Sequence, residues 1–132
     1  MKISVDTNVL VRFVVRDDEN QWRAAVKILQ DAEIVAISMS CLCESVWVLK
    51  KSYRFGQEEI SAVVDTLLDA GNVVVNREAV EAGLATFKAG GDFADGVIAY
   101  EGSMMGGETF VSFDKKAVSL ISKSGQQVLL LS

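Results

Sequence analysis

The sequence of 132 residues contains no histidine and no proline, and it has only two cysteines. Without histidine the chain cannot build a serine–histidine or cysteine–histidine nucleophile, a histidine general base or a zinc site with histidine ligands. Cys41 and Cys43 would point apart on a helix, so we expect neither a disulfide nor a shared metal and interpret both as core or near-core residues. Any catalysis must therefore use carboxylates, lysines, hydroxyls or a hard metal ion.

Long hydrophobic runs are also missing. No apolar run approaches the roughly 18 to 20 residues that would span a bilayer, and Lys2 leads straight into a strand-like pattern without the apolar segment of a signal peptide. We therefore expect a cytoplasmic protein with no membrane partner. The net charge of −5 argues against tight, purely electrostatic binding of nucleic acid, although a local basic stripe would be compatible with it.

The composition and the pattern along the chain indicate one α/β domain over residues 1–132. Half of the residues are hydrophobic and 23% are charged, and neither a repeat nor a linker divides the chain. Strand-like segments lie at residues 2–5, 34–38, 72–75, 109–112 and 127–131. Apolar residues at helical spacing lie between them, within residues 22–29, 42–53, 60–68, 80–87 and 94–98. This alternation predicts a mainly parallel five-stranded sheet flanked by helices.

Five acidic residues lie where the functional groups of such a sheet collect, just beyond the carboxyl ends of the strands. Asp6 directly follows the first predicted strand, Glu44 lies in the first turns of the helix after the second, and Asp114 follows the fourth by two residues. Asp92 and Asp95 open another helix and share one face of it. We expect these carboxylates to meet at one edge of the sheet.

Each of these acids also has a structural explanation. Asp92 and Asp95 can be the N-cap and the N3 carboxylate of their helix, Asp114 can cap the next helix, Glu44 can be an exposed helical residue, and Asp6 can belong to a turn. Together, however, converging carboxylates would repel one another and destabilise the fold unless a cation neutralised them. Carboxylates without imidazole or thiolate partners suit Mg²⁺ or Mn²⁺.

Four motifs in order, VDTNVLVRF, CLCESVWVL, DFADGVIA and SFD, resemble the PIN-domain ribonucleases, and especially the VapC-type toxins of bacterial toxin–antitoxin pairs. The resemblance covers nearly the whole chain in length and motif order. It implies a PIN-like three-layer sandwich and a Mg²⁺- or Mn²⁺-dependent endoribonuclease acting on tRNA or rRNA. The partners that it implies are a cognate antitoxin protein and a second copy of the chain in a homodimer.

The resemblance also implies roles for particular residues. The acidic catalytic and metal-binding site carries over to Asp6, Glu44, Asp95 and Asp114, with Asp92 as an additional acid. Thr7, Asn8 and Ser112 would support the acids rather than ligate metal, and Asn8 can cap the helix after Asp6 while Asp6 faces the metal. Gly96 stands where a small alanine is more usual, which should loosen its helix turn slightly.

Several side chains are candidates for binding RNA. Arg12 and Arg16 lie four residues apart on the helix after Asp6 and can contact the RNA backbone, with ordinary solvated charges as the alternative. Weaker candidates are the cations at the end of the Glu44 helix and after Asp114, namely Lys50, Lys51, Arg54, Lys115 and Lys116. Trp22 and Trp47 could stack on bases, but their place among apolar helical residues favours packing in the core or in an interface.

Two alternatives remain from the sequence. A phospho-accepting receiver domain has a similar size and class, but it needs an acidic pair after the first strand, an aspartate after the third and a lysine after the fifth. Here Asp6 stands alone, Asn76 and Arg77 follow the third strand, and no lysine follows the last. The other alternative is a housekeeping PIN nuclease without an antitoxin.

Overall fold

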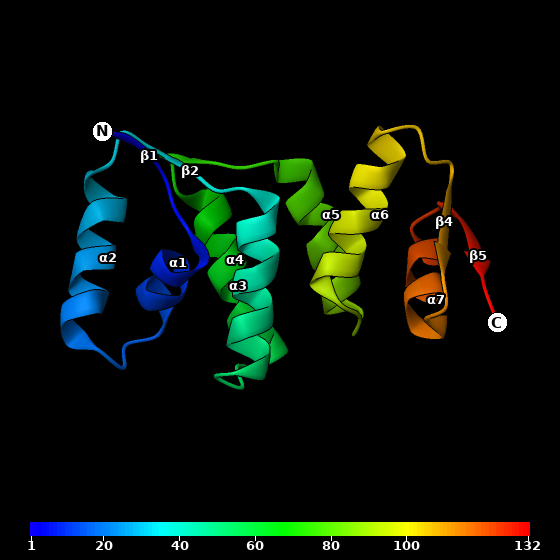
Figure 1. The fold of residues 1–132 in the computed structure, drawn as a ribbon, viewed down its shortest axis with the longest axis horizontal. Coiled ribbons are helices and arrows are strands. Elements are labelled where there is room, and N and C mark those ends of the chain that lie inside the picture. Colours follow the sequence, from blue (N-terminus) through cyan, green and yellow to red (C-terminus); the bar gives the residue numbers. More distant parts are fainter. The chain divides into compact units, whose positions relative to one another are not determined.

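The computed structural model describes residues 1–132, and the chain divides into two compact units, Met1–Asn76 and Arg77–Ser132. All strand pairs are parallel and alternate with helices, which confirms the α/β class (Figure 1). The prediction of a single five-stranded sheet is wrong, because the first unit holds three strands and the second holds two. None of the helices has the length and apolar character that crossing a membrane would require.

The first unit begins with a strand that leads into the first predicted motif. Its elements are β1 (Lys2–Ser4), α1 (Thr7–Val14), α2 (Glu19–Asp31), β2 (Ile34–Ala36), α3 (Met39–Lys51), α4 (Gln57–Asp69) and β3 (Val73–Val74). The strands pair in the order β1-β2-β3, with Ile3 opposite Val35 and Val35 opposite Val73. Val35 is fully buried, whereas Val74, which points to the other face, is 54% exposed.

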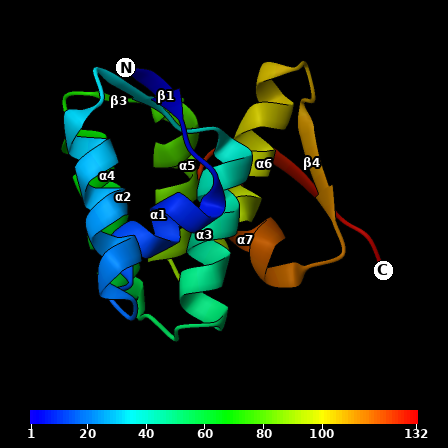
Figure 2. The ribbon, with the colours of Figure 1, turned by 60° about the vertical axis from the view of Figure 1, so that its left-hand side comes forward.

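Helices α1, α3 and α4 supply most of the buried side chains of the first unit, and α1 packs against both α2 and α3 (Figure 2). On α3 and α4 the buried side chains recur every three or four residues, as amphipathic packing requires. Leu42, Val46 and Leu49 are the buried face of α3. Asn72 closes the end of α2, because its side-chain amide donates hydrogen bonds of 2.8 and 3.0 Å to the carbonyls of Leu29 and Ala32.

Trp47 is not a core residue, contrary to one of the two packing roles expected for it. Its side chain is 57% exposed on α3. The reason is rotational: Trp47 follows Val46 by one residue, and one residue is about 100° around a helix, so the burial of Val46 and Leu42 turns Trp47 toward solvent. The apolar residues around Trp47 in the sequence therefore did not indicate on which face of the helix it lies.

The second unit contains α5 (Arg77–Lys88), α6 (Phe93–Met104), β4 (Thr109–Ser112), α7 (Lys115–Lys123) and β5 (Gln127–Leu130). Helices α5 and α6 pack closely because glycines meet where they cross. A Cβ atom on Gly96 would lie 2.5 Å from the carbonyl oxygen of Ala82 and 2.9 Å from the Cα of Gly83. The departure from alanine at Gly96 thus has a packing reason.

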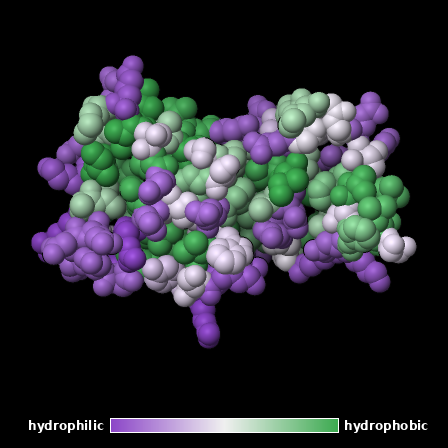
Figure 3. Space-filling model, in the orientation of Figure 1, coloured by the Kyte–Doolittle hydropathy of each residue, from purple (hydrophilic) through white to green (hydrophobic).

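Strands β4 and β5 form a parallel pair that packs against α7. Phe110 and Val128 are paired and half-buried, whereas the paired Val111 and Leu129, on the other face, are 48% and 51% exposed. Figure 3 shows this apolar surface over β4 and β5. One face of the pair therefore belongs to the core of the unit and the other is open.

Candidate metal centre

Asp6 is held at the N-terminus of α1 by its own side chain. Its backbone is extended, and its Oδ1 accepts a hydrogen bond of 3.0 Å from the Val9 N–H. The prediction that Asn8 caps this helix is wrong, because Asp6 occupies the cap position and Asn8 lies in the first turn. One oxygen satisfies the backbone, so Oδ2 of this exposed residue is left to face a ligand.

Glu44, on α3, and Asp6 both act through their charges on one thiol. The thiol belongs to Cys41, which is buried and lies one turn before Glu44. Burial is the main cause that raises the pKa of Cys41, hydrogen bonds with Ser45 and Thr7 oppose it, and the charges of Asp6 and Glu44 raise it further. Asp6 and Glu44 are therefore both near enough to Cys41 for their charges to raise its pKa.

In the second unit, the charges of Asp92 and Asp114 both act on Asp95. Asp92 caps α6, with its Oδ1 accepting a hydrogen bond of 2.9 Å from the Ala94 N–H, and Asp95 lies in the first turn of the same helix. Asp95 is half-buried, and burial is the main cause that raises its pKa, followed by the charges of Asp92 and Asp114. Asp95 is therefore a partly desolvated carboxylate among other carboxylates.

Asp114 caps α7 and is fixed from two sides. Its Oδ1 accepts hydrogen bonds of 2.9 and 3.1 Å from the N–H groups of Lys116 and Ala117. Its own N–H donates to the hydroxyl of Ser112 at 3.0 Å. Ser112, the last residue of β4, thus accepts a hydrogen bond from the turn that carries this acid, and its supporting role in the site stays a prediction.

The residues fit a divalent cation by their chemistry. Within neither unit is there a group of three or more acidic or cysteine side chains arranged to hold a metal ion. Each unit nevertheless presents exposed carboxylate oxygens, which are the ligands that Mg²⁺ and Mn²⁺ prefer. None of the five acids forms an ion pair with a lysine or arginine, so no protein cation competes for them. A single centre made from both sets stays a prediction.

Arg12 and Arg16 are already engaged within the first unit. Arg12 forms an ion pair with Asp17, which raises the pKa of Arg12. Arg16 pairs with Glu19 at 2.7 Å, which lowers the pKa of Glu19, and its guanidinium lies 3.8 Å from the centre of the Trp22 ring. These ion pairs stabilise the turn between α1 and α2. Contact of Arg12 and Arg16 with RNA stays a prediction.

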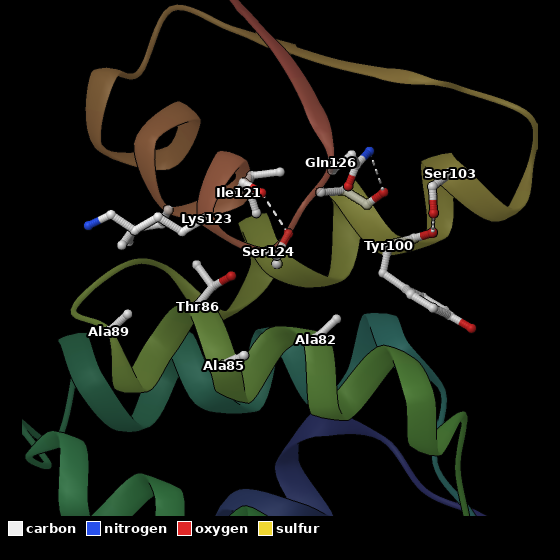
Figure 4. Close-up of a pocket in the computed structure, with 13 residues that line it drawn as sticks. Ala82, Ala85, Thr86, Ala89, Tyr100, Ser103, Ile121, Lys123, Ser124 and Gln126 are labelled. Carbon is white, nitrogen blue, oxygen red and sulfur yellow. Dashed lines mark hydrogen bonds between the residues drawn. The ribbon is translucent and has the colours of Figure 1, made fainter.

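The second unit also contains a cavity of about 430 Å³ between α5, α6 and α7 (Figure 4). Its wall consists largely of small residues. The hydroxyls of Ser103 and Ser124 donate to backbone carbonyls, as does the amide of Gln126. Because none of the five acids lines it, the cavity adds nothing to the candidate centre.

The chain matches the model of the PIN domain family over residues 3–119, a span that contains all five acids. It therefore belongs to the PIN domain family. No curated protein matches it. PIN domains are typically nucleases that depend on Mg²⁺ or Mn²⁺. This chain therefore has a nuclease-type fold, and nucleases are hydrolases. The match confirms the PIN resemblance and does not distinguish a VapC-type toxin from other PIN nucleases.

Proposed function

We propose that the protein is an endoribonuclease that uses Mg²⁺ or Mn²⁺ at a centre formed by Asp6, Glu44, Asp95 and Asp114, with Asp92 beside it. The observation that carries the proposal is that all five carboxylates lie at strand ends or in the first turns of helices, and none is paired with a cation. Acids placed at random on a surface would not coincide with one family's motif positions in this way.

The chemistry requires a neutralised phosphate and a nucleophile near pH 7. A bound divalent cation supplies both, by lowering the pKa of a water and stabilising charge on the phosphate oxygens. Asp6, Asp95 and Asp114 would hold the cation, and Glu44 would orient the attacking water and accept its proton. Ser112 would support Asp114 through the hydrogen bond that its hydroxyl accepts from the Asp114 N–H, and Thr7 would support Asp6. Hydrolysis by water would leave a 5′-phosphate and a 3′-hydroxyl.

We further propose the role of a VapC-type toxin, with tRNA or rRNA as substrate, a cognate antitoxin as partner, and a homodimeric form. The order and spacing of the four motifs support this subtype. A housekeeping PIN nuclease is the second candidate. A small reading frame directly upstream that encodes a DNA-binding protein would favour the toxin, and its absence would favour the housekeeping enzyme.

Cleavage of total small RNA by the purified protein tests the central proposal. We expect cleavage in Mg²⁺ or Mn²⁺ and none in EDTA, and we expect Asp6→Asn and Asp95→Asn to abolish it. The matched control is Asp18→Asn, because Asp18 caps α2 through a hydrogen bond of 3.1 Å to Gln21 but lies outside the proposed centre. Cleavage that persists in EDTA, or equally in the two site variants, would refute the proposal.

A further inference from the structure

Helix α3 carries an exposed stripe in which Glu44, Trp47 and Lys51 follow one another. Their spacing of three and then four residues places them on one helix face, with neighbouring Cβ atoms about 5–6 Å apart. All three are exposed, and they lie opposite the buried face of Leu42 and Leu49. An acid, an indole and an ammonium group are thus aligned along two turns of the same rigid element.

The cations of the first unit that are free to bind an anion are concentrated at this end of α3. The unit has eight lysines and arginines, and five of them form ion pairs, namely Lys2, Arg12, Arg16, Arg23 and Lys27. The remaining three, Lys50, Lys51 and Arg54, form none and are exposed. The positive charge that the sequence suggested for Arg12 and Arg16 is therefore available one turn beyond Trp47 instead.

The two tryptophans differ in how far their rings are covered by other side chains. The ring of Trp22 is half-buried and lies under the Arg16 guanidinium at 3.8 Å. Trp47 has no such cover and is 57% exposed. Of the two tryptophans, only Trp47 therefore offers an open aromatic face, and it lies one helix turn from the proposed catalytic Glu44.

We propose that Trp47 stacks on an unpaired nucleobase of the RNA while Lys51 binds a neighbouring phosphate, so that the strand runs along α3 to Glu44. This inference depends on the proposed function, because it names the substrate class of that same site as single-stranded RNA. Stacking on an aromatic side chain accepts any base, and a cation beside it holds the backbone. Tryptophan itself is common in protein interfaces, but Glu44 and Lys51 on either side of it are of types depleted there. The unpaired cations Lys50, Lys51 and Arg54 favour an anionic occupant, which makes RNA more suitable than a protein partner.

Binding of a fluorescein-labelled uridine decamer, measured by fluorescence anisotropy in Mg²⁺, tests the inference. An Asp6→Asn background prevents cleavage during the measurement. We expect Trp47→Ala to weaken binding by about 5- to 150-fold, the range measured for loss of one base–aromatic stack, and Trp47→Phe to retain most of the affinity. A fully paired RNA duplex should show no effect of Trp47→Ala, because its bases stack within the duplex.

The dependence of binding on salt separates the two residues. Removing one phosphate contact to a single strand reduces the slope of log affinity against log salt concentration by about 0.7. We expect Lys51→Gln to cause this reduction and Trp47→Ala to leave the slope unchanged. Lys27→Gln, which removes an equally exposed lysine paired with Asp31, is the control and should change neither slope nor affinity.

The outcomes keep this inference apart from the proposed function. If the wild-type protein cleaves RNA while Trp47→Ala binds the decamer as tightly as its parent, the stacking site is refuted and the nuclease remains. If Trp47→Ala converts a dimer to a monomer in sedimentation without changing affinity for RNA, Trp47 belongs to an interface between copies, and the inference is refuted as well. If the wild-type protein neither binds nor cleaves RNA, the proposed function itself fails.

Discussion

Replacing Gly96 by alanine is expected to destabilise the protein although alanine favours helices. A Cβ atom at this position would lie 2.5 Å from the Ala82 carbonyl oxygen, 2.7 Å from the Thr86 hydroxyl and 2.9 Å from the Gly83 Cα. Two of these three atoms are backbone, so a rotamer change cannot relieve the overlap. Helices α5 and α6 would have to separate.

The size of the effect follows from two opposing contributions. Alanine for glycine within a helix stabilises by about 1 kcal/mol, whereas overpacking a close contact costs about 3 kcal/mol at the upper end of its usual range. We expect the free energy of unfolding to fall by about 2 kcal/mol. For a chain of this size that corresponds to a decrease in melting temperature of about 8 °C. Urea unfolding followed by circular dichroism measures the first quantity, and a thermal scan measures the second.

Gly102 on the same helix provides the matched control. No atom lies within 4 Å of a Cβ built on Gly102, so Gly102→Ala should gain the helix propensity of about 1 kcal/mol without the overlap. Gly83→Ala should fall between the two, because its Cβ would meet the side chains of Phe93 and Val97, which can move. If Gly96→Ala proves as stable as Gly102→Ala, the two helices have room at the crossing and the packing argument is wrong.

Three further predictions concern single side chains and the metal. Asn72→Ala removes two hydrogen bonds to carbonyls at the end of α2 and should lower the free energy of unfolding by about 1–3 kcal/mol in urea titrations; an unchanged midpoint would contradict it. Iodoacetamide at pH 8 should modify Cys41 more slowly than Cys43 in the native protein, because burial raises the pKa of Cys41 and leaves less thiolate at that pH. Mass spectrometry measures the two rates, and the difference between them should be abolished in urea. Mn²⁺ at about 100 times its dissociation constant should stabilise the wild-type protein by about 2.7 kcal/mol in thermal scans and leave Asp95→Asn unaffected; equal shifts would place the ion elsewhere.

Local patterns in the sequence were sufficient to find the strands and helices, because their signals are short-range. The five predicted strand segments contain the five strands, and most of the apolar residues at helical spacing are buried or half-buried, although Ile98 is 57% exposed. The partition of the strands into sheets of three and two was not predictable in this way. Pairing joins residues far apart in the chain, and nothing in a single strand's composition specifies its neighbour.

The errors at Asn8 and Trp47 have a related cause. Asparagine is common at helix caps, and Asn8 was given that role; tryptophan is common in cores and in interfaces, and the core was one of the two packing roles given to Trp47. The environment of each residue depends instead on where its helix begins and on which face of that helix is buried. Helix α1 begins one residue before Asn8, so Asp6 becomes the cap, and the buried face of α3 lies on the side away from Trp47. A shift of one residue changes a side chain's direction on a helix by about 100°. The apolar periodicity of a sequence does not locate the ends of a helix to within one residue.

The structural and the catalytic explanations of the acids are compatible, because a carboxylate has two oxygens. In Asp6, Asp92 and Asp114, Oδ1 accepts the backbone N–H bonds of a helix start, and Oδ2 makes no hydrogen bond within the protein. Capping fixes the direction of the second oxygen, which gives a metal ligand the rigidity it needs. Asparagine preserves the accepting Oδ1 and removes the charge, whereas alanine removes both. A fold that tolerates asparagine while losing the metal would therefore show that one residue carries both roles, and loss of fold with asparagine would show that the charge itself serves the helix.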